Sequence, residues 1–418
     1  MGGFNGVSIN MSDKPSIIFV DDQSNVLQGF KRALRSLEET WNIQYATGGK
    51  EALKLMEAAH VDIVISDTNM PGMRGTELLK EVQTLHPEMI RLVLSGGGSR
   101  SDDISTLLRT SHQFFAKPFE TERLKTLVTN LLDMREKVGD DNVRKLVASI
   151  SRLPCSPFIY ESFKKERESS SSDLDKMGTF IAQDPSLTAK MLQSLNSAFF
   201  GVNKAGIHPF TAAQSMGPGT ISYLFDEDAH NHTVAANHAN YNFLAGVYKN
   251  SLHGALLLEA LAAAENLPDN LKNIAYVTGM LSNVGTIILA YELAEPYSKL
   301  VSGFKSPATQ AQAEKKAFGA SHDVVGAYFL ALWGFPAASV AATANILTPD
   351  KDPDQTLNLT TLLHVAYAFT QTDDFEAQKA LLNMPYLEKL GVADKLQKWH
   401  DLDKEIRAQT DLRNWQFG

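Results

Sequence analysis

The sequence predicts an α/β domain built on a doubly wound parallel sheet, followed by a larger all-α domain. Up to about residue 137, short Val/Ile/Phe runs bounded by polar residues alternate with segments of helical period. Beyond Val138 the strand signal fades, and Ala- and Leu-rich helical periodicity continues to the end of the chain. A length of 418 residues with 44% hydrophobic content allows two or three domains. We therefore predict a disordered tail at 1–14, the α/β domain at 15–137 and the helical domain at 138–418.

Each element of the first domain follows from one of these runs. The expected strands are Ser16 to Val20, Ile43 to Thr47, Val61 to Ser66, Ile90 to Leu94 and Gln113 to Ala116. Apolar residues at three- and four-residue spacing predict helices at Asn25 to Leu37, Glu51 to Ala58, Thr76 to Leu85, Asp103 to Leu108 and Thr121 to Val138. Five strand–helix units of this kind indicate a doubly wound sheet, whose ligands bind at the carboxyl ends of the strands.

Charged and hydroxyl side chains fall at those strand ends. Asp21 and Asp22 close the first run, Asp67 the third, Ser95 the fourth, and Lys117 comes after the fifth. A carboxylate becomes a useful nucleophile toward a phosphoryl group only when a cation offsets the charge between two anions, and Mg²⁺ prefers such oxygen ligands. The spacing therefore predicts a phosphate-accepting pocket in which Asp22 and Asp67 supply two metal ligands.

The loop at residues 67–75, with the sequence DTNMPGMRG, resembles the signature loop of response-regulator receiver domains. The resemblance extends over residues 15–137 with matched spacing. It implies a flavodoxin-like (βα)5 receiver fold that is phosphorylated by a cognate sensor histidine kinase or a phosphotransfer protein. Gly72 and Gly75 are expected to permit turns of the backbone around this loop.

The resemblance also implies a role for each residue of the pocket. Asp67 would accept the phosphoryl group, and the backbone carbonyl of Asn69 would join Asp22 and Asp67 in binding Mg²⁺. Asp21 would hold metal-bound water. Lys117 would neutralise an oxygen of the phosphoryl group.

Two further residues fit the switching half of the receiver pattern. Ser95 would follow the phosphoryl group, and Phe114 would turn inward behind it, although an ordinary core position is the alternative for Phe114. The surface formed by the fourth helix, fifth strand and fifth helix would then change, and a homodimer could form through it. Gly96 leaves space for water near the acyl phosphate, so we expect the phosphorylated state to be short-lived.

The second domain resembles HDOD domains, the HD-related output domains. The resemblance rests on the stretches at residues 181–192, 195–201 and 322–336, and it covers roughly residues 143–370. It implies an all-helical, HD-like fold related to metal-dependent phosphohydrolases. Whether this domain can hold a catalytic metal therefore depends on the residues at the ligand positions of those enzymes.

Those positions carry poor metal ligands. Asn250 stands where the first histidine would be, Ser282 and Asn283 replace the His-Asp pair, and Leu347 and Thr348 replace the later paired histidines. Hydroxyl, amide and aliphatic side chains bind divalent metals weakly or not at all. We therefore expect no catalytic residues and no cofactor in the HDOD domain.

Several histidines require separate interpretation. His322 lies at a family position but cannot hold a metal alone, so we interpret it as a helix-packing residue. His253 lies three residues after Asn250 and is a weak substitute ligand. His230, His232 and His238 form a cluster of ligand-capable residues whose spacing matches no metal motif known to us.

The leading functional hypothesis is a phosphorylation-dependent response regulator whose non-catalytic HDOD domain binds an unknown downstream protein. The alternative is an HD-type phosphohydrolase or cyclic-dinucleotide phosphodiesterase controlled by the receiver domain. Nucleic-acid binding is disfavoured by the net charge of −9. The single cysteine, Cys155, excludes an intramolecular disulfide framework. We find no signal peptide or membrane span and expect a cytoplasmic protein.

Overall fold

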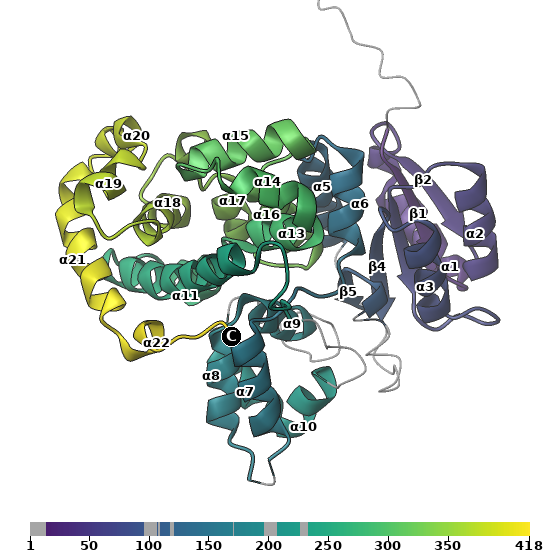
Figure 1. Cartoon of the computed structure of the whole chain (residues 1–418). Helices are drawn as coiled ribbons and strands as arrows, with labels where there is room; N and C mark the ends of the chain where they lie inside the picture. Colours follow the sequence, from purple (N-terminus) through teal and green to yellow (C-terminus); the bar gives the residue numbers. More distant parts are fainter. Residues whose placement is uncertain are drawn as a thin grey trace, which may run out of the picture. The chain divides into compact units, whose positions relative to one another are not determined.

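The computed structural model in Figure 1 describes residues 14–95, 107, 109–117, 121–169, 171–195, 207–225 and 233–418. The chain divides into two compact units, Met1–Leu132 and Asp133–Gly418. The division falls inside helix α5 (Thr121–Lys137), slightly before the predicted boundary at residue 137. The first unit contains a sheet and the second consists of helices, so the predicted combination of an α/β and an all-α domain is confirmed.

The sheet of the first unit has five parallel strands in the order β2-β1-β3-β4-β5. The strands are β1 (Ser16–Val20), β2 (Asn42–Ala46), β3 (Ile63–Asp67), β4 (Ile90–Ser95) and β5 (Gln113–Ala116). All residues of β1 and β3 are buried, because parallel strands covered by helices on both faces have no solvent side. The order confirms the predicted doubly wound sheet.

The helices of this unit largely follow the predicted amphipathic segments. They are α1 (Ser24–Ala33), the short 3₁₀ turn η1 (Arg35–Leu37), α2 (Gly49–Ala58), α3 (Gly75–Leu85) and α5. The prediction of a single helix from Asn25 to Leu37 is wrong. Helix α1 ends before the buried residue Leu34, and the carbonyl of Leu34 accepts a hydrogen bond from the N–H of Leu37, only three residues later. Such 3₁₀ tightening is common at helix ends. Most of the helix expected at 103–108 lies outside the described residues.

The second unit is built from helices joined by short connections. They are α6 (Asp141–Ser149), α7 (Pro157–Arg167), α8 (Leu174–Ala182), α9 (Pro185–Leu195), α10 (Pro209–Leu224), α11 (Tyr241–Ala264), α12 (Asp269–Leu281), α13 (Val284–Glu292), α14 (Ala294–Val301), α15 (Pro307–Phe318), α16 (His322–Leu332), α17 (Ala337–Ala344), η4 (Pro349–Lys351), α18 (Leu359–Thr370), α19 (Phe375–Ala380), α20 (Met384–Lys389), η5 (Ala393–Lys395), α21 (Leu396–Arg407) and α22 (Thr410–Arg413). Figure 1 shows α11 as the long helix at the centre of this unit, with α21 crossing one of its ends.

The core of the second unit lies where α11, α12, α18 and α21 pack together. Leu258, Leu362 and Trp399 are among its fully buried side chains. Trp333 and Phe335 are buried as well, so their interpretation as core residues is confirmed. Glycines let the helices approach closely at two crossings. A Cβ atom on Gly279 would overlap the backbone of Gly254, and α11 and α12 meet there.

The second close crossing lies between α13 and α16. A Cβ atom on Gly285 in α13 would overlap the backbone carbonyl of His322 in α16. Because backbone cannot move aside as a flexible side chain can, Gly285→Ala should lower the free energy of unfolding by about 3 kcal/mol. Gly246→Ala is the matched control, because its Cβ would meet nothing within 4 Å and alanine is the better helix former. Urea unfolding checks both variants, and equal stability of the two would contradict the expectation.

One described stretch, Asp269–Glu292, is long and apolar enough to cross a membrane. It contains α12 and α13, and 94% of its most apolar window is buried inside the helical unit. That degree of burial is typical of the core of a helical domain.

Candidate functional site

The strand register brings the predicted receiver residues to one edge of the sheet. Val20 pairs with Ser66, so the residues that follow them, Asp21 and Asp67, lie side by side. Asp67 in turn pairs with Leu94, and the next residue of β4, Ser95, pairs with Ala116. Lys117 directly follows Ala116. Parallel pairing therefore gathers at this edge residues that are far apart in the sequence.

Lys117 joins the two buried acids. Its Nζ donates to Asp21 Oδ2 at 2.7 Å and to Asp67 Oδ1 at 2.5 Å. The other oxygen of Asp67 accepts a hydrogen bond from the backbone N–H of Asn69 at 2.7 Å. Burial alone lowers the pKa of Lys117, but the hydrogen bonds and charges of the two carboxylates outweigh it and raise this pKa. Lys117 therefore stays charged beside Asp67.

Asp22 has an unsatisfied oxygen in this pocket. Its Oδ1 atom is buried and has no hydrogen-bond partner, which is costly for a carboxylate oxygen unless a cation or water satisfies it. Asp21 and Asp67 are instead bridged by Lys117, and no group of three or more His, Cys, Asp or Glu side chains converges as a ready-made metal site anywhere in the described part of the chain. The hard oxygen donors of Asp22 and Asp67 fit Mg²⁺ in kind.

The switch residues are only partly described. Ser95 ends β4, but its side chain lies outside the described atoms, as do residues Gly96–Gly98. Phe114 is buried in β5, an inward position that is compatible with either a switch or a core role. Gly72 adopts a positive φ of 82°, as expected for a turn glycine. Gly75 has a different reason: a Cβ atom there would overlap the carbonyl of Asp67, so glycine lets α3 begin against the acid.

Two of the five residues expected at the HD ligand positions share a cavity. Asn250 and Asn283 line the same cavity, whereas Ser282 hydrogen-bonds to the carbonyl of Gly279 in its own helix at 2.8 Å. Leu347 packs against the hydrophobic core, and Thr348 is the residue before η4. Ser282, Leu347 and Thr348 are not among the described residues that line this cavity.

His322 forms a buried pair with Glu314, a residue that the sequence patterns did not single out. The Nδ1 and backbone N–H of His322 both bond to Glu314 Oε2, at 2.6 and 2.8 Å, while Tyr297 donates to Oε1 at 2.6 Å. Burial alone lowers the pKa of His322, but Glu314 outweighs it and raises that pKa. Tyr367 lies 3.1 Å from the Nε2 atom. The interpretation of His322 as a hydrogen-bonded packing residue is confirmed.

His253 pairs with a carboxylate that is far from it in the sequence and was not predicted as its partner. Its Nε2 atom lies 2.6 Å from Asp403 Oδ1, 150 residues later in the chain. The other oxygen of Asp403 accepts bonds from Arg407 and Gln378, both at 2.9 Å. The pair connects α11 to α21. Because Asp403 is fully buried and both of its oxygens accept hydrogen bonds, it is not an open ligand site.

The remaining histidine cluster is mostly outside the described residues, which exclude His230 and His232. His238 is described: its Nε2 atom bonds to the Tyr291 carbonyl at 3.2 Å, and its Nδ1 atom accepts the N–H of Asn240 at 3.1 Å. Both of its ring nitrogens therefore already have protein partners.

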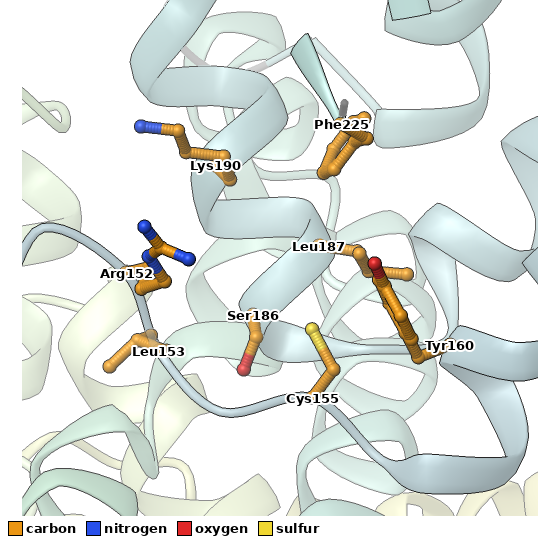
Figure 2. A pocket seen from close by; sticks show the side chains of 8 residues that line it. All are labelled: Arg152, Leu153, Cys155, Tyr160, Ser186, Leu187, Lys190 and Phe225. Atoms are coloured by element: carbon orange, nitrogen blue, oxygen red, sulfur yellow. The ribbon is translucent and has the colours of Figure 1, made fainter. Parts of the chain in front are cut away.

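A second, smaller hollow surrounds the single cysteine. Figure 2 shows Arg152 and Lys190 on the left of this hollow and Cys155, Tyr160 and Phe225 toward its right. Its volume is about 20 Å³, which is room for about one water molecule. Burial, together with the charge of nearby Asp184, raises the pKa of Cys155 well above its usual value, so the thiol is neutral. This hollow therefore has neither the volume nor the reactivity of an active site.

Comparison with known families agrees with this geometry. The family model of the response regulator receiver domain matches residues 17–129, which span the acidic pocket, and the HDOD domain model matches residues 153–349.

The chain is a response regulator that joins a receiver domain to an HDOD domain.

Three of the curated proteins that are similar to the regulator match about a third of its length. The regulator is 29% identical over 144 residues to the transcriptional regulatory protein GlrR of Escherichia coli K12, a match that covers 34% of this chain and 32% of GlrR. It is 26% identical to the response regulator MprA of Mycobacterium leprae, covering 36% of this chain and 64% of MprA. The sensor kinase CckA of Brucella abortus matches at 32% identity, over 30% of this chain and 13% of the kinase. The regulator thus spans about a third of GlrR.

Two of the solved structures similar to the regulator match more than half of this chain. The MmoQ response regulator of Methylococcus capsulatus is 19% identical and matches with a TM-score of 0.48, covering 60% of this chain and 98% of that chain. A virulence factor of Campylobacter jejuni is 20% identical and matches with a TM-score of 0.47, covering 67% and 99%.

Proposed function

We propose that the regulator is a phosphorylation-dependent switch in which Asp67 accepts a phosphoryl group from a sensor histidine kinase or a phosphotransfer protein. The observation that supports this best is the bridge from Lys117 to Asp21 and Asp67 at the carboxyl edge of the sheet. An acid that is to attack a dianionic phosphoryl group needs positive charge fixed beside it before the reaction. Lys117 holds such a charge within hydrogen-bond distance of the attacking carboxylate.

In the transfer, an oxygen of the Asp67 carboxylate forms a bond to phosphorus, and the bond from phosphorus to the donor histidine nitrogen breaks. The nitrogen keeps the electron pair and takes up a proton. Mg²⁺ bound by Asp22, Asp67 and the carbonyl of Asn69, with Asp21 holding its water, would supply further positive charge beside the phosphoryl oxygens. The N–H of Asn69 fixes one oxygen of Asp67, and so orients the other. Ser95 and Phe114 would then respond to the new charge.

Removing the charge of Lys117 should have two measurable effects. Lys117→Gln should slow phosphorylation by acetyl phosphate by about 100-fold, since one fixed charge-stabilising donor is lost. The same variant should bind Mg²⁺ more tightly, because the ammonium no longer competes for Asp21 and Asp67. Initial rates and calorimetric Mg²⁺ titrations measure the two effects, with exposed Lys80→Gln as the control. A variant that is phosphorylated at the normal rate would contradict the role of Lys117.

For the HDOD domain, we propose an output role through protein–protein contact without catalysis. Asn250 and Asn283 line the same cavity with amide side chains, which are weaker metal ligands than an imidazole or a carboxylate. Nothing in the described helical unit favours the alternative of a phosphohydrolase or cyclic-dinucleotide phosphodiesterase. Metal analysis together with a turnover assay would detect such an enzyme. A response regulator of this kind would act in the cytoplasm, where kinases meet their receivers, and would need neither nucleic acid nor a membrane.

Capture of partners tests the switch as a whole. Tagged full-length regulator is incubated with cell extract in the presence of Mg²⁺, with and without beryllium fluoride, which mimics the phosphoryl group. We expect a protein that is enriched at least tenfold in only one of the two states. Asp67→Asn should capture the same set of proteins in both states, and gel filtration of the same samples would show whether the active state dimerises. Identical capture by the wild-type protein in both states would contradict the switch.

A further inference from the structure

The HDOD domain contains an open cavity at the place where the HD ligands are replaced. Its volume is about 270 Å³, and ten described residues line it, none of them charged. Pockets for drug-sized molecules begin at about 300 Å³, so this cavity suits a smaller ligand. Since burying an unpaired charge is costly, an uncharged ligand fits this lining better than a phosphate ester or a carboxylate.

One wall of the cavity is a polar stripe along α11. Asn242, Gly246 and Asn250 follow one another at four-residue spacing and therefore share a helix face. The side chains of Asn242 and Asn250 make no hydrogen bond to any other described residue, so both amides are available to a ligand. Phe243 adds a half-buried aromatic ring beside this stripe.

The other walls come from residues in or next to three other helices, and Asn283 is the buried amide among them. Asn283 precedes α13 and donates to Ser251 at 3.3 Å, which leaves its carbonyl oxygen and one N–H unused. Gln310 of α15 uses its NH₂ group toward Thr286, Tyr297 and Glu314, so its carbonyl oxygen is the group left to accept. Gln371 lies at the rim, after α18.

Asn242, Asn250 and Asn283 each offer a donor and an acceptor to the cavity, whereas the NH₂ groups of both glutamines already have protein partners. The ring of Phe243 lies next to these amides. Side-chain amides pair in bidentate fashion with the edges of nucleobases, and aromatic rings stack on their faces. We propose that this cavity binds a free nucleobase or nucleoside, that is, an uncharged planar molecule with adjacent donors and acceptors. The proposal does not depend on the phosphorylation of Asp67, because every residue in it belongs to the helical unit.

Two residues that line the cavity also contact the buried Glu314–His322 pair. Tyr367 lines the cavity and lies 3.1 Å from His322 Nε2, while Gln310 lines it and donates to Glu314 at 3.0 Å. When His322 is protonated, its Nε2–H donates to the Tyr367 oxygen, and the phenolic proton is then free to point elsewhere. A ligand would therefore change the hydrogen bonds around the buried Glu314–His322 pair.

Calorimetric titration of the full-length protein tests the proposal with adenine, adenosine, guanosine, cytidine and uridine. We expect at least one of them to bind with a Kd below about 1 mM, and the monophosphate of that nucleoside to bind at least tenfold more weakly. Asn250→Ala should weaken the binding at least tenfold. Asn273→Ala, at an exposed position of α12, is the matched control and should bind as the wild type does.

A second variant separates loss of binding from loss of fold. Gly246→Leu should fill the cavity and abolish binding while the melting temperature is retained, because a Cβ atom at Gly246 meets nothing within 4 Å. The proposal is overturned if no compound binds, if both cavity variants bind normally, or if the monophosphate binds as tightly as the nucleoside. Failure of Asp67 phosphorylation would leave this result unaffected.

Discussion

Asp67→Asn should reduce the phosphorylation of the regulator to the background of the assay. Asparagine has nearly the same shape as aspartate, but its neutral amide oxygen is a poor nucleophile. Lys117 contacts two carboxylates, and the substitution removes that of Asp67 and leaves that of Asp21. Acetyl phosphate with Mg²⁺ serves as the phosphate donor, and intact-protein mass spectrometry measures the fraction of phosphorylated chains.

The matched control for this substitution is Asp133→Asn, at an exposed position of α5. It should be phosphorylated to the same extent as the wild type. Peptide mapping distinguishes Asp67 from the neighbouring acids Asp21 and Asp22 as the modified residue. A phosphorylated Asp67→Asn protein, or a phosphoryl group found on another acid of the wild type, would contradict the proposed chemistry.

Glu314→Gln should strongly destabilise the protein, with a loss of about 3–5 kcal/mol in the free energy of unfolding near pH 6. Glu314 is fully buried, and His322, Tyr297 and Gln310 all bond to its carboxylate. Removing one member of a buried pair leaves the other charge without compensation. Glu295→Gln, at an exposed position of α14, is the control and should change stability by less than about 0.5 kcal/mol.

The same pair predicts how stability depends on pH. Burial alone raises the pKa of Glu314, but the charge and hydrogen bond of His322 outweigh it and lower this pKa, and Glu314 in turn raises the pKa of His322. The contribution of His322 is thus complete below about pH 6.5 and is lost as the pH rises through its raised pKa. That of Glu314 is present above about pH 4.5 and is lost on acidification.

Denaturant unfolding at several pH values measures this dependence. The wild type should lose stability as the pH rises from about 6.5, because its unfolded state no longer binds the proton that folded His322 retains. In Glu314→Gln, burial without the carboxylate favours neutral His322, so the variant should lose stability on acidification instead. Asp323 and the buried Tyr367 also face His322, and burial raises the pKa of Tyr367, which keeps its proton. A wild type and a variant with the same slope would contradict the ion pair.

Much of the receiver could be predicted from local sequence, because a buried parallel strand is a short apolar run and its ends carry the chemistry. Five such runs predicted the sheet, and the two that end at Val20 and Ser66 placed Asp21 and Asp67 at one edge. The end of α1 at Ala33 was not predicted, since the helical period continues through η1 to Leu37. The residue at which a helix changes into a 3₁₀ turn depends on which side chain packs into the core.

The chemical identity of each side chain is determined by the sequence alone, including the amides of Asn250 and Asn283 and the hydroxyl of Ser282. The partners of buried charges were decided only by the tertiary structure. Glu314 with His322, and His253 with Asp403, are joined across packed helices and show no periodicity of their own. Each of these buried carboxylates needs such a partner because the core excludes the water that would otherwise solvate it. The amide-lined cavity depends in the same way on four helices meeting, which no local pattern encodes.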